Sequence, residues 1–403
     1  MMPHSRTPRH GLVWLLWVLV GAACGGPAQT GLSSRVSAAD AMTGLPASPV
    51  TEEQVLRGRQ LLISHACSLC HGGSGNPTSD RWLAGNPGDT IAIGPFRAWP
   101  RNLTPDQETG LGRFSERQIF NALRYGLRPS ATADVEITSP VPGQGNHPAN
   151  PNYLSPAMPW LWWRYMRDQE LWDIVAYLKH GVRPVGHRVP DSEAPPDFWA
   201  SEFAAEKIGT HILPSFPAEH EELRAPERLE QILRGRRLVA TRVCSGCHGG
   251  ALSPDQEGWL AGMRSEVQEF RIGAFKTRPR NVTPDNTTGL GRFTERQIFN
   301  ALRYGLRPGE TPDVEITSAT PGEGNHPLNP KYLAPPMPWT DWRHMADEEL
   351  WAIAAYLKNG VKPVRHRVED SEGPPDFWVS EYTVEKYGTY PAPVFPTARE
   401  QRP

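Results

Sequence analysis

The sequence predicts a mainly α-helical fold with two tandem helical domains and long Pro/Gly-rich loops. Its 403 residues are enough for two or three domains. Most of the chain consists of two copies of one unit. The 42 prolines and 37 glycines favour irregular loops and short helices over a large regular sheet, and no strong alternating strand pattern is present.

The internal duplication sets the predicted domain boundaries. Phe114–Pro129 recurs almost letter for letter as Phe293–Pro308, 179 residues later. The copies run from about residue 50 to 224 and from 225 to 403, and each is longer than the repeat of a solenoid protein. We therefore expect one domain in residues 50–224 and a second in residues 225–403.

The first two predicted helices of each copy have recognisable ends. The first begins near Thr51, whose spacing to Gln54 is typical of a capping box, and runs into the cysteine motif at Cys67. The second begins at Ser115 with the same signal and ends near Gly126.

The third predicted helix carries one apolar stripe, which we expect to face the core. It runs from about residue 168 to 179 and stops at Gly181. Its apolar residues follow the i, i+3, i+4, i+7 spacing of a helix that packs on one side, and the second copy repeats them. The two sets are Leu171, Ile174, Val175 and Leu178, and Leu350, Ile353, Ala354 and Leu357.

Two Cys-x-x-Cys-His motifs are the most informative feature of the chain, and they use four of its five cysteines. They are Cys67-Ser-Leu-Cys70-His71 and Cys244-Ser-Gly-Cys247-His248. Two thiols at this spacing can add to the vinyl groups of a porphyrin as thioethers, and the following histidine is then held where it binds the iron. The sequence therefore predicts two covalently bound haem c groups, with the cysteines as attachment points and the histidines as iron ligands.

Three other uses of these cysteines remain as alternatives. A four-thiolate zinc site usually has its pairs within a few tens of residues, whereas Cys67 and Cys244 lie 177 residues apart. A thioredoxin-type redox pair would follow a strand in a βαβ pattern, which the surrounding sequence does not show. Structural disulfides are the third alternative in an exported protein. The histidine at the same place in both motifs favours haem.

The three helices and the cysteine motif together resemble the class I cytochrome c domain, and the resemblance covers both copies. It implies that the first and last helices cross and pack around the haem. The stretch Asn102-Leu-Thr-Pro-Asp106, followed by Thr109-Gly-Leu-Gly112 and later by Met-Pro-Trp, is similar to the cytochrome subunits of membrane-associated bacterial dehydrogenases that oxidise alcohols, aldehydes or sugar acids. Many of those subunits carry three haems, whereas this chain has two motifs.

The resemblance also implies a methionine as the second iron ligand in each copy. Met158, in Ser-Pro-Ala-Met-Pro-Trp, and Met337, in Ala-Pro-Pro-Met-Pro-Trp, match this role, and the prolines stiffen their loops. Met166 and Met345 also agree between the copies, but we expect them in the core. Histidines that agree between the copies are the alternative ligands: His147 and His326, and His187 and His366.

Residues near the motifs have candidate roles around the haem. Arg101 and Asn102 are either partners of the haem propionates or part of a solvated basic loop. Gly94-Pro95 is a candidate source of the acceptor for the axial histidine, because small c-type cytochromes use a backbone carbonyl soon after the motif, often on a proline. The tryptophans after each methionine are expected to shield the haem and fill the core. The counterparts in the second copy are Arg280, Asn281 and Gly273-Ala274, which lacks the proline but keeps a carbonyl.

The N-terminus predicts export and a lipid anchor. Residues 1–23 have the basic start and the short apolar run of a signal peptide. Cys24 follows directly and resembles the lipidated cysteine of a bacterial lipoprotein, with ordinary signal cleavage as the alternative. Residues 24–49 predict a flexible tether. We therefore expect the folded part in the bacterial periplasm, tethered to the membrane as a lipoprotein.

Taken together, these features predict an electron carrier rather than an enzyme. Iron with both axial positions filled is suited to passing electrons, here between a periplasmic dehydrogenase and a respiratory acceptor such as an oxidase or another cytochrome. The formal net charge of −2 gives no reason to expect a nucleic-acid partner. A dihaem peroxidase, which needs an open iron position, is the alternative, and a haem-based redox sensor is a third class.

Overall fold

The computed structural model describes residues 49–403 apart from 89, 94, 194, 196–197, 205–210, 251, 264–268 and 371–376. The predicted signal peptide (1–23), Cys24 and all but the last residue of the predicted tether (24–49) lie outside the described residues. In the part of the chain that is described, no helix is long and apolar enough to cross a membrane.

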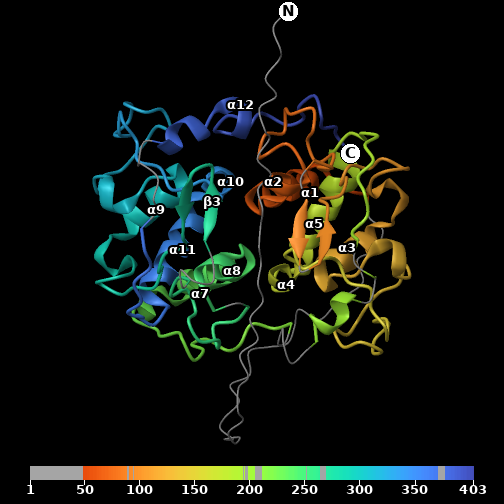
Figure 1. Cartoon of the computed structure of the whole chain (residues 1–403), viewed down its shortest axis with the longest axis horizontal. Helices are drawn as coiled ribbons and strands as arrows, with labels where there is room; N and C mark the ends of the chain where they lie inside the picture. The colour runs from red at the N-terminus through yellow and green to blue at the C-terminus, as the bar shows by residue number, and fades with distance from the viewer. Residues whose placement is uncertain are drawn as a thin grey trace, which may run out of the picture.

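The chain forms two halves that lie side by side, and helices are their main regular structure. We call residues 49–224 the first half and residues 225–403 the second half; they occupy the right and the left of Figure 1. The α-helices of the first half are α1 (Glu52–Ser64), α2 (Cys67–His71), α3 (Glu116–Tyr125), α4 (Trp160–Trp163) and α5 (Asp168–Ala176). Those of the second half are α7 (Leu229–Thr241), α8 (Cys244–His248), α9 (Glu295–Tyr304), α10 (Trp339–Trp342), α11 (Asp347–Asn359) and α12 (Val384–Tyr387).

Short helical turns join these helices. A π-helical turn, η3 (Tyr177–Gly181), extends α5 to the glycine at which the sequence predicts the end of the third helix. The 3₁₀ turns are η1 (Leu111–Arg113), η2 (Pro129–Ala131), η4 (Phe198–Ser201), η5 (Pro226–Arg228), η6 (Leu290–Arg292), η7 (Pro308–Glu310) and η8 (Phe377–Glu381).

Local capping places the helix starts where the sequence predicts them. The Thr51 hydroxyl accepts a hydrogen bond from the Gln54 N–H, and the Gln54 side chain accepts one from the Thr51 N–H. Helix α3 begins at Ser115 in the same way and ends at Gly126, whose φ is 70°. One expectation was wrong: the first helix does not run into the cysteine motif. Ala66 has a φ of 57°, which a right-handed helix cannot accommodate, so α2 starts as a separate helix.

The first and last long helices of each half cross, as the cytochrome c resemblance implies. Helix α1 packs against α5, and α7 packs against α11. A Cβ at Gly58 would lie 1.8 Å from the Asp173 carbonyl oxygen, and one at Gly235 would lie 1.9 Å from the Ala352 carbonyl oxygen. Because no side chain fits in that space, glycine is required where the two backbones meet.

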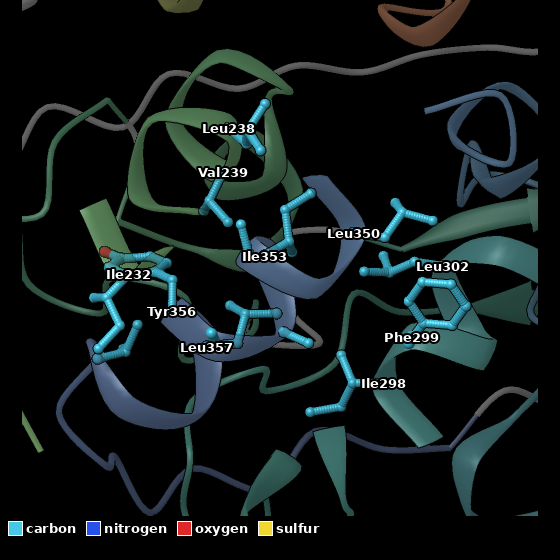
Figure 2. Packing of buried hydrophobic residues seen from close by; sticks show 14 of the residues in the cluster. Ile232, Leu238, Val239, Ile298, Phe299, Leu302, Leu350, Ile353, Tyr356 and Leu357 are labelled. Carbon is cyan, nitrogen blue, oxygen red and sulfur yellow. The ribbon is translucent and has the colours of Figure 1, made fainter. Parts of the chain in front are cut away.

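The apolar stripe of the last helix forms the core of this crossing. In the second half, Ile353 and Leu357 of α11 lie between Ile232 of α7 and Ile298 of α9 (Figure 2). All eight residues of the two predicted stripes are buried in the corresponding hydrophobic clusters, which confirms the prediction. Each fully buried leucine or isoleucine contributes about 1.5–3 kcal/mol, so the crossing is a major source of stability.

Each half also contains a small antiparallel hairpin that the sequence did not predict. Strand β1 (Ile91–Ile93) pairs with β2 (Phe96–Ala98), and β3 (Phe270–Ile272) pairs with β4 (Phe275–Thr277). Strands of three residues are too short to show a clear alternation of apolar and polar residues, which explains why the pattern was missed.

The C-terminal segment of each half packs on the other half. Residues 214–224 lie against the second half, where the Arg224 N–H donates to the Asn359 carbonyl oxygen. Residues 393–402 return to the first half, where the Gln401 N–H donates to the Gly181 carbonyl oxygen. Figure 1 shows this return, since the C-terminus lies beside α1 and α5. We call 214–224 and 393–402 the exchanged segments.

A buried carboxylate holds each exchanged segment in place. Glu400 accepts hydrogen bonds from Arg59 Nε at 2.6 Å and from Tyr177 Oη at 2.5 Å, and Tyr177 Oη accepts one from Trp82 Nε1 at 2.9 Å. The side chain of Glu400 is fully buried. The same network recurs in the second half with Glu221, Arg236, Tyr356 and Trp259.

This packing differs from the boundary predicted between residues 224 and 225. That boundary follows the sequence repeat, whereas Phe216 and Leu223 pack against the core of the second half and Phe395 belongs to the core of the first. The repeat alone cannot reveal the exchange, because the two segments and the surfaces that receive them recur in both copies of the sequence.

We expect Glu400→Ala to lower the free energy of unfolding of the haem-loaded protein by about 3–5 kcal/mol, because Arg59 keeps a buried charge without a counterion. Chemical denaturation followed by circular dichroism measures this change. The matched control is Asp80→Ala, which removes an exposed partner of Arg399 and should cost about 0–1 kcal/mol. Equal costs for the two variants would contradict the role of Glu400.

Candidate functional site

Each cysteine motif forms a short helix with sharply defined ends. Helix α2 follows Ala66 and α8 follows Val243, and both residues are left-handed, with φ of 57° and 62°. Gly72 and Gly249 end the helices with φ of 99° and 97°. Each motif therefore occupies little more than one helical turn, which brings its two thiols and its histidine together.

The histidine of each motif is held in the tautomer that a metal ligand requires. His71 Nδ1 lies 2.7 Å from the Arg101 carbonyl oxygen, and His248 Nδ1 lies 2.6 Å from the Arg280 carbonyl oxygen. A carbonyl can only accept, so Nδ1 carries the proton and Nε2 keeps the lone pair with which a histidine binds a metal. Burial lowers the pKa of both histidines, which favours the neutral imidazole that iron binds.

These carbonyls correct the predicted acceptors. The sequence indicated Gly94-Pro95 and Gly273-Ala274, but the structure uses the arginine carbonyls, and Gly94 lies outside the described residues. The physical reason is a backbone pairing next to the motif. The Leu103 N–H donates to the Leu83 carbonyl oxygen, and this bond aligns the chain at Arg101 with the histidine.

The four thiols fit haem attachment better than zinc or redox chemistry. None of them forms a disulfide, and among the described residues no group of three or more His, Cys, Asp or Glu could hold a metal ion. Burial raises the pKa of Cys67 and Cys244 to about 12 and that of Cys247 to about 11. Such thiols are protonated at neutral pH, whereas thiol–disulfide exchange uses the thiolate. The zinc alternative is disfavoured by the separation of the two pairs, since a zinc site uses two nearby pairs.

Several buried N–H donors that lack acceptors among the described residues also fit the binding of a large group with polar substituents, such as haem. The indole N–H groups of Trp199 and Trp378 occupy matching positions in the two halves, and neither has a hydrogen-bond partner within the described residues. The buried Nη2 of Arg128 also has none there. Buried donors are rarely left unpaired, so these atoms are compatible with acceptor oxygens that the polypeptide does not supply, such as haem propionates.

The two predicted methionine ligands pack against the same hydrophobic clusters as the first cysteines of the motifs. Met158 packs against the same hydrophobic cluster as Cys67, and Met337 packs against the same cluster as Cys244. Met166 is buried in the core of the first half, as expected, and Met345 is its counterpart in the second half.

His147 lies in a different part of the first half. Its ring stands edge-on to Tyr125, with 5.8 Å between ring centroids, and it also contacts Tyr153. These tyrosines belong to a hydrophobic cluster separate from that of Met158 and Cys67. His326 has the same arrangement in the second half, beside Tyr304 and Tyr332.

The other candidate histidine, His187, uses both ring nitrogens within the protein. Its Nδ1 lies 2.8 Å from the Ala84 carbonyl oxygen, and its Nε2 lies 3.2 Å from Arg81 Nη2. Neither nitrogen is left for a metal. His366 makes the equivalent Nδ1 contact with the Ala261 carbonyl oxygen at 2.8 Å.

The propionate role proposed for Arg101 and Asn102 is not supported. The Asn102 amide is buried and donates to the Val185 carbonyl oxygen at 2.8 Å and to the Thr109 hydroxyl at 3.0 Å. Arg101 pairs with Asp191 at the surface, as the solvated-loop interpretation predicts. Asn281 and Arg280 repeat both arrangements.

Comparisons with known proteins agree with this chemistry. Residues 232–360 match the cytochrome c family model, so the second half contains a cytochrome c domain, which binds haem c covalently. Haem attachment therefore accounts for the cysteines of the Cys244–His248 motif, and a structural disulfide is not needed to explain them.

The chain is also homologous to cytochrome subunits of bacterial dehydrogenases. It is 26% identical to the gluconate 2-dehydrogenase cytochrome c subunit of Pantoea cypripedii, over 78% of this chain and 61% of that protein. It is 26% identical to the fructose dehydrogenase cytochrome subunit of Gluconobacter japonicus, over 62% and 45%. It is 25% identical to the cytochrome c subunit of the quinone alcohol dehydrogenase of Gluconacetobacter polyoxogenes, over 64% and 47%. The matches thus span less than two thirds of each relative, and the relatives' names agree with the predicted electron-transfer component.

We expect His147→Gln to leave the iron ligands unchanged, because the His147 ring is enclosed by tyrosines of another cluster. The variant should bind as much haem as the unmodified protein and show the same absorption bands in the oxidised and reduced states. His326→Gln is the matched variant for the second half. A change in the ligand-sensitive bands of either variant would identify its histidine as a ligand.

Proposed function

We propose that the chain is a dihaem c-type cytochrome of two tandem class I cytochrome c domains, which carries electrons between a periplasmic dehydrogenase and a respiratory acceptor. The observation that carries this proposal is the equal geometry of the two motifs. In both halves, a carbonyl fixes Nδ1 of the histidine, and a Met-Pro loop packs on the cluster that holds the first cysteine.

Each half supplies one complete set of haem-binding residues in this proposal. The first set is Cys67, Cys70, His71 and Met158, and the second is Cys244, Cys247, His248 and Met337. The position of each methionine in the cluster of its own motif supports it as the second ligand. The separate placement of His147 and the occupied nitrogens of His187 give the histidines less support.

Haem c supplies one-electron chemistry when it is bound. The protein residues then act by holding both axial positions, excluding water and fixing the imidazole orientation. A site with both axial positions filled favours electron transfer over binding of peroxide. The peroxidase alternative requires one half to lose a ligand, and the equivalent Met-Pro loops and the relatives give it no support.

The partners and the location are part of the same proposal. The names of the relatives support a dehydrogenase as the electron donor. The N-terminal signal and Cys24, as a lipid attachment site, would place the protein in the periplasm at the membrane surface. Haem attachment outside the cytoplasm fits this placement.

Ligand replacement tests the proposal directly. We expect Met158→His and Met337→His each to remove about half of the methionine-to-iron charge-transfer absorbance of the oxidised protein, because each replaces one of two thioether ligands. A pyridine haemochrome assay should give two haems per chain for the unmodified protein and for both variants.

Carbon monoxide binding separates the carrier from the enzyme. The reduced protein should not bind carbon monoxide, since no iron position is open. For the two ligand replacements above, the matched control is Met166→Leu. Met166 is a core residue, so its replacement should leave the charge-transfer band intact. Carbon monoxide binding together with peroxide turnover by the unmodified protein would favour the peroxidase.

A further inference from the structure

The two cysteine motifs begin close to the interface between the halves. His65 and Arg242 occupy the same position in the repeat, each two residues before its motif, and their side chains contact each other. Equivalent residues of a pseudo-twofold pair touch only when they lie near the axis that relates the halves. Helices α2 and α8 therefore lie on either side of this axis, between the two halves in Figure 1.

The helix after each methionine packs on the opposite half, either on the cysteine motif or just after it. Helix α4 follows Met158, and its Trp162 Nε1 donates to the Ser245 hydroxyl within α8 at 3.1 Å. Helix α10 follows Met337, and its Asp341 lies beside Gly75, with Oδ1 3.3 Å from where a Cβ of that glycine would stand. Trp162 and Asp341 occupy the same position in the repeat. The first motif thus faces a carboxyl group where the second faces an indole.

Asp341 is a buried acid without a counterion in direct contact. Its side chain is fully buried, Oδ2 accepts from the Thr340 hydroxyl at 3.2 Å, and Oδ1 has no hydrogen-bond partner within the described residues. The nearby Arg343 donates instead to the carbonyl oxygens of Tyr387 and Gly388. Burial raises the pKa of Asp341 to about 7. The charged and titratable groups that face the carboxyl are Arg343, Tyr387 and Cys67.

The second motif has the opposite charge beside it. Arg242 is buried, donates to the Ser64 hydroxyl at 3.2 Å, and stands two residues before Cys244. Its positive charge acts to lower the pKa of the Cys244 thiol against the larger effect of burial, whereas the negative charge of Asp341 adds to the effect of burial on Cys67. Arg242 also acts on Cys67, but less strongly than Asp341 does.

We propose that Asp341 and Arg242 make the two haem sites unequal, with the lower reduction potential at Cys67–His71 and the higher one at Cys244–His248. This inference rests on the proposed function, since it requires a haem at each motif. A nearby negative charge stabilises the more positive, oxidised iron, and a nearby positive charge stabilises the reduced iron. In the half-reduced protein, one electron would pass from the first site to the second. The first site would thereby become oxidised and the second would become reduced. The transfer needs no further reactant.

A potentiometric titration of the haem-loaded protein at about pH 8.5 tests the inference, because Asp341 is then mainly ionised. We expect two one-electron steps. Asp341→Asn should raise the lower step and reduce the ratio of the two reduction equilibria by about tenfold, which corresponds to ~59 mV for one electron. Arg242→Gln should lower the upper step. Trp162→Phe is the matched control, because it changes no charge and should leave both steps in place.

Met158→His assigns the steps to the two halves. The added histidine ligand lowers the potential of its own haem, so it should move the lower step and leave the upper one. Movement of the upper step by Met158→His would overturn the inference. An unchanged separation of the two steps in both Asp341→Asn and Arg242→Gln, with two haems bound, would also overturn it. Either result would leave the proposed function intact. Fewer than two haems in the unmodified protein would instead overturn the proposed function.

Discussion

The buried carboxylates Glu400 and Glu221 are the interactions on which the rest of the structure depends. Each joins an exchanged segment to the first long helix through arginine and to the last long helix or its extension through tyrosine. The tyrosine also accepts from the tryptophan of the loop that follows the cysteine motif. One network therefore connects the helix before the motif, the loop after it and the helix that covers it. A buried ion pair is costly to desolvate, and these carboxylates are stable there because several donors satisfy each of them.

The geometry of the two proposed haem sites follows from this frame. The crossing helices meet at Gly58 and Gly235, and the loops behind the motifs bring an arginine carbonyl to each histidine. Both features are backbone features, and they are the same in both halves. Two differences between the halves lie in side chains at the interface, where Asp341 stands in the place of Trp162 and Arg242 faces His65. The backbone thus makes the two sites alike, while the side chains give them different electrostatic surroundings.

The parts of the structure that could be predicted are those determined by neighbouring residues. The capping boxes at Thr51 and Ser115, the stripe on the last helix and the spacing of each cysteine motif are all readable within a few residues. The acceptor of the axial histidine could not be read in this way, because it depends on a backbone pairing between Leu83 and Leu103.

The exchange of the two segments and the position of Asp341 also could not be predicted from the sequence. Both depend on which half a segment contacts, and two nearly identical copies give the sequence no means of choosing. The duplication by itself predicts that the two motifs have equivalent surroundings. The same duplication, once its copies are placed in contact, shows that the residues surrounding each motif come partly from the other copy.

The exchanged segments have a consequence for how such a chain can arise. A single copy that ends in its own tail would lack the segment that covers its first helix, and it would offer that tail to another molecule. Two such molecules would complete each other as a domain-swapped homodimer. The present chain has the connectivity of such a dimer after fusion of its two subunits, with residues 214–224 acting both as the linker and as one of the swapped tails. Gene duplication in this case would have made a pre-existing assembly covalent, so that its two interface positions were free to diverge into Trp162 and Asp341.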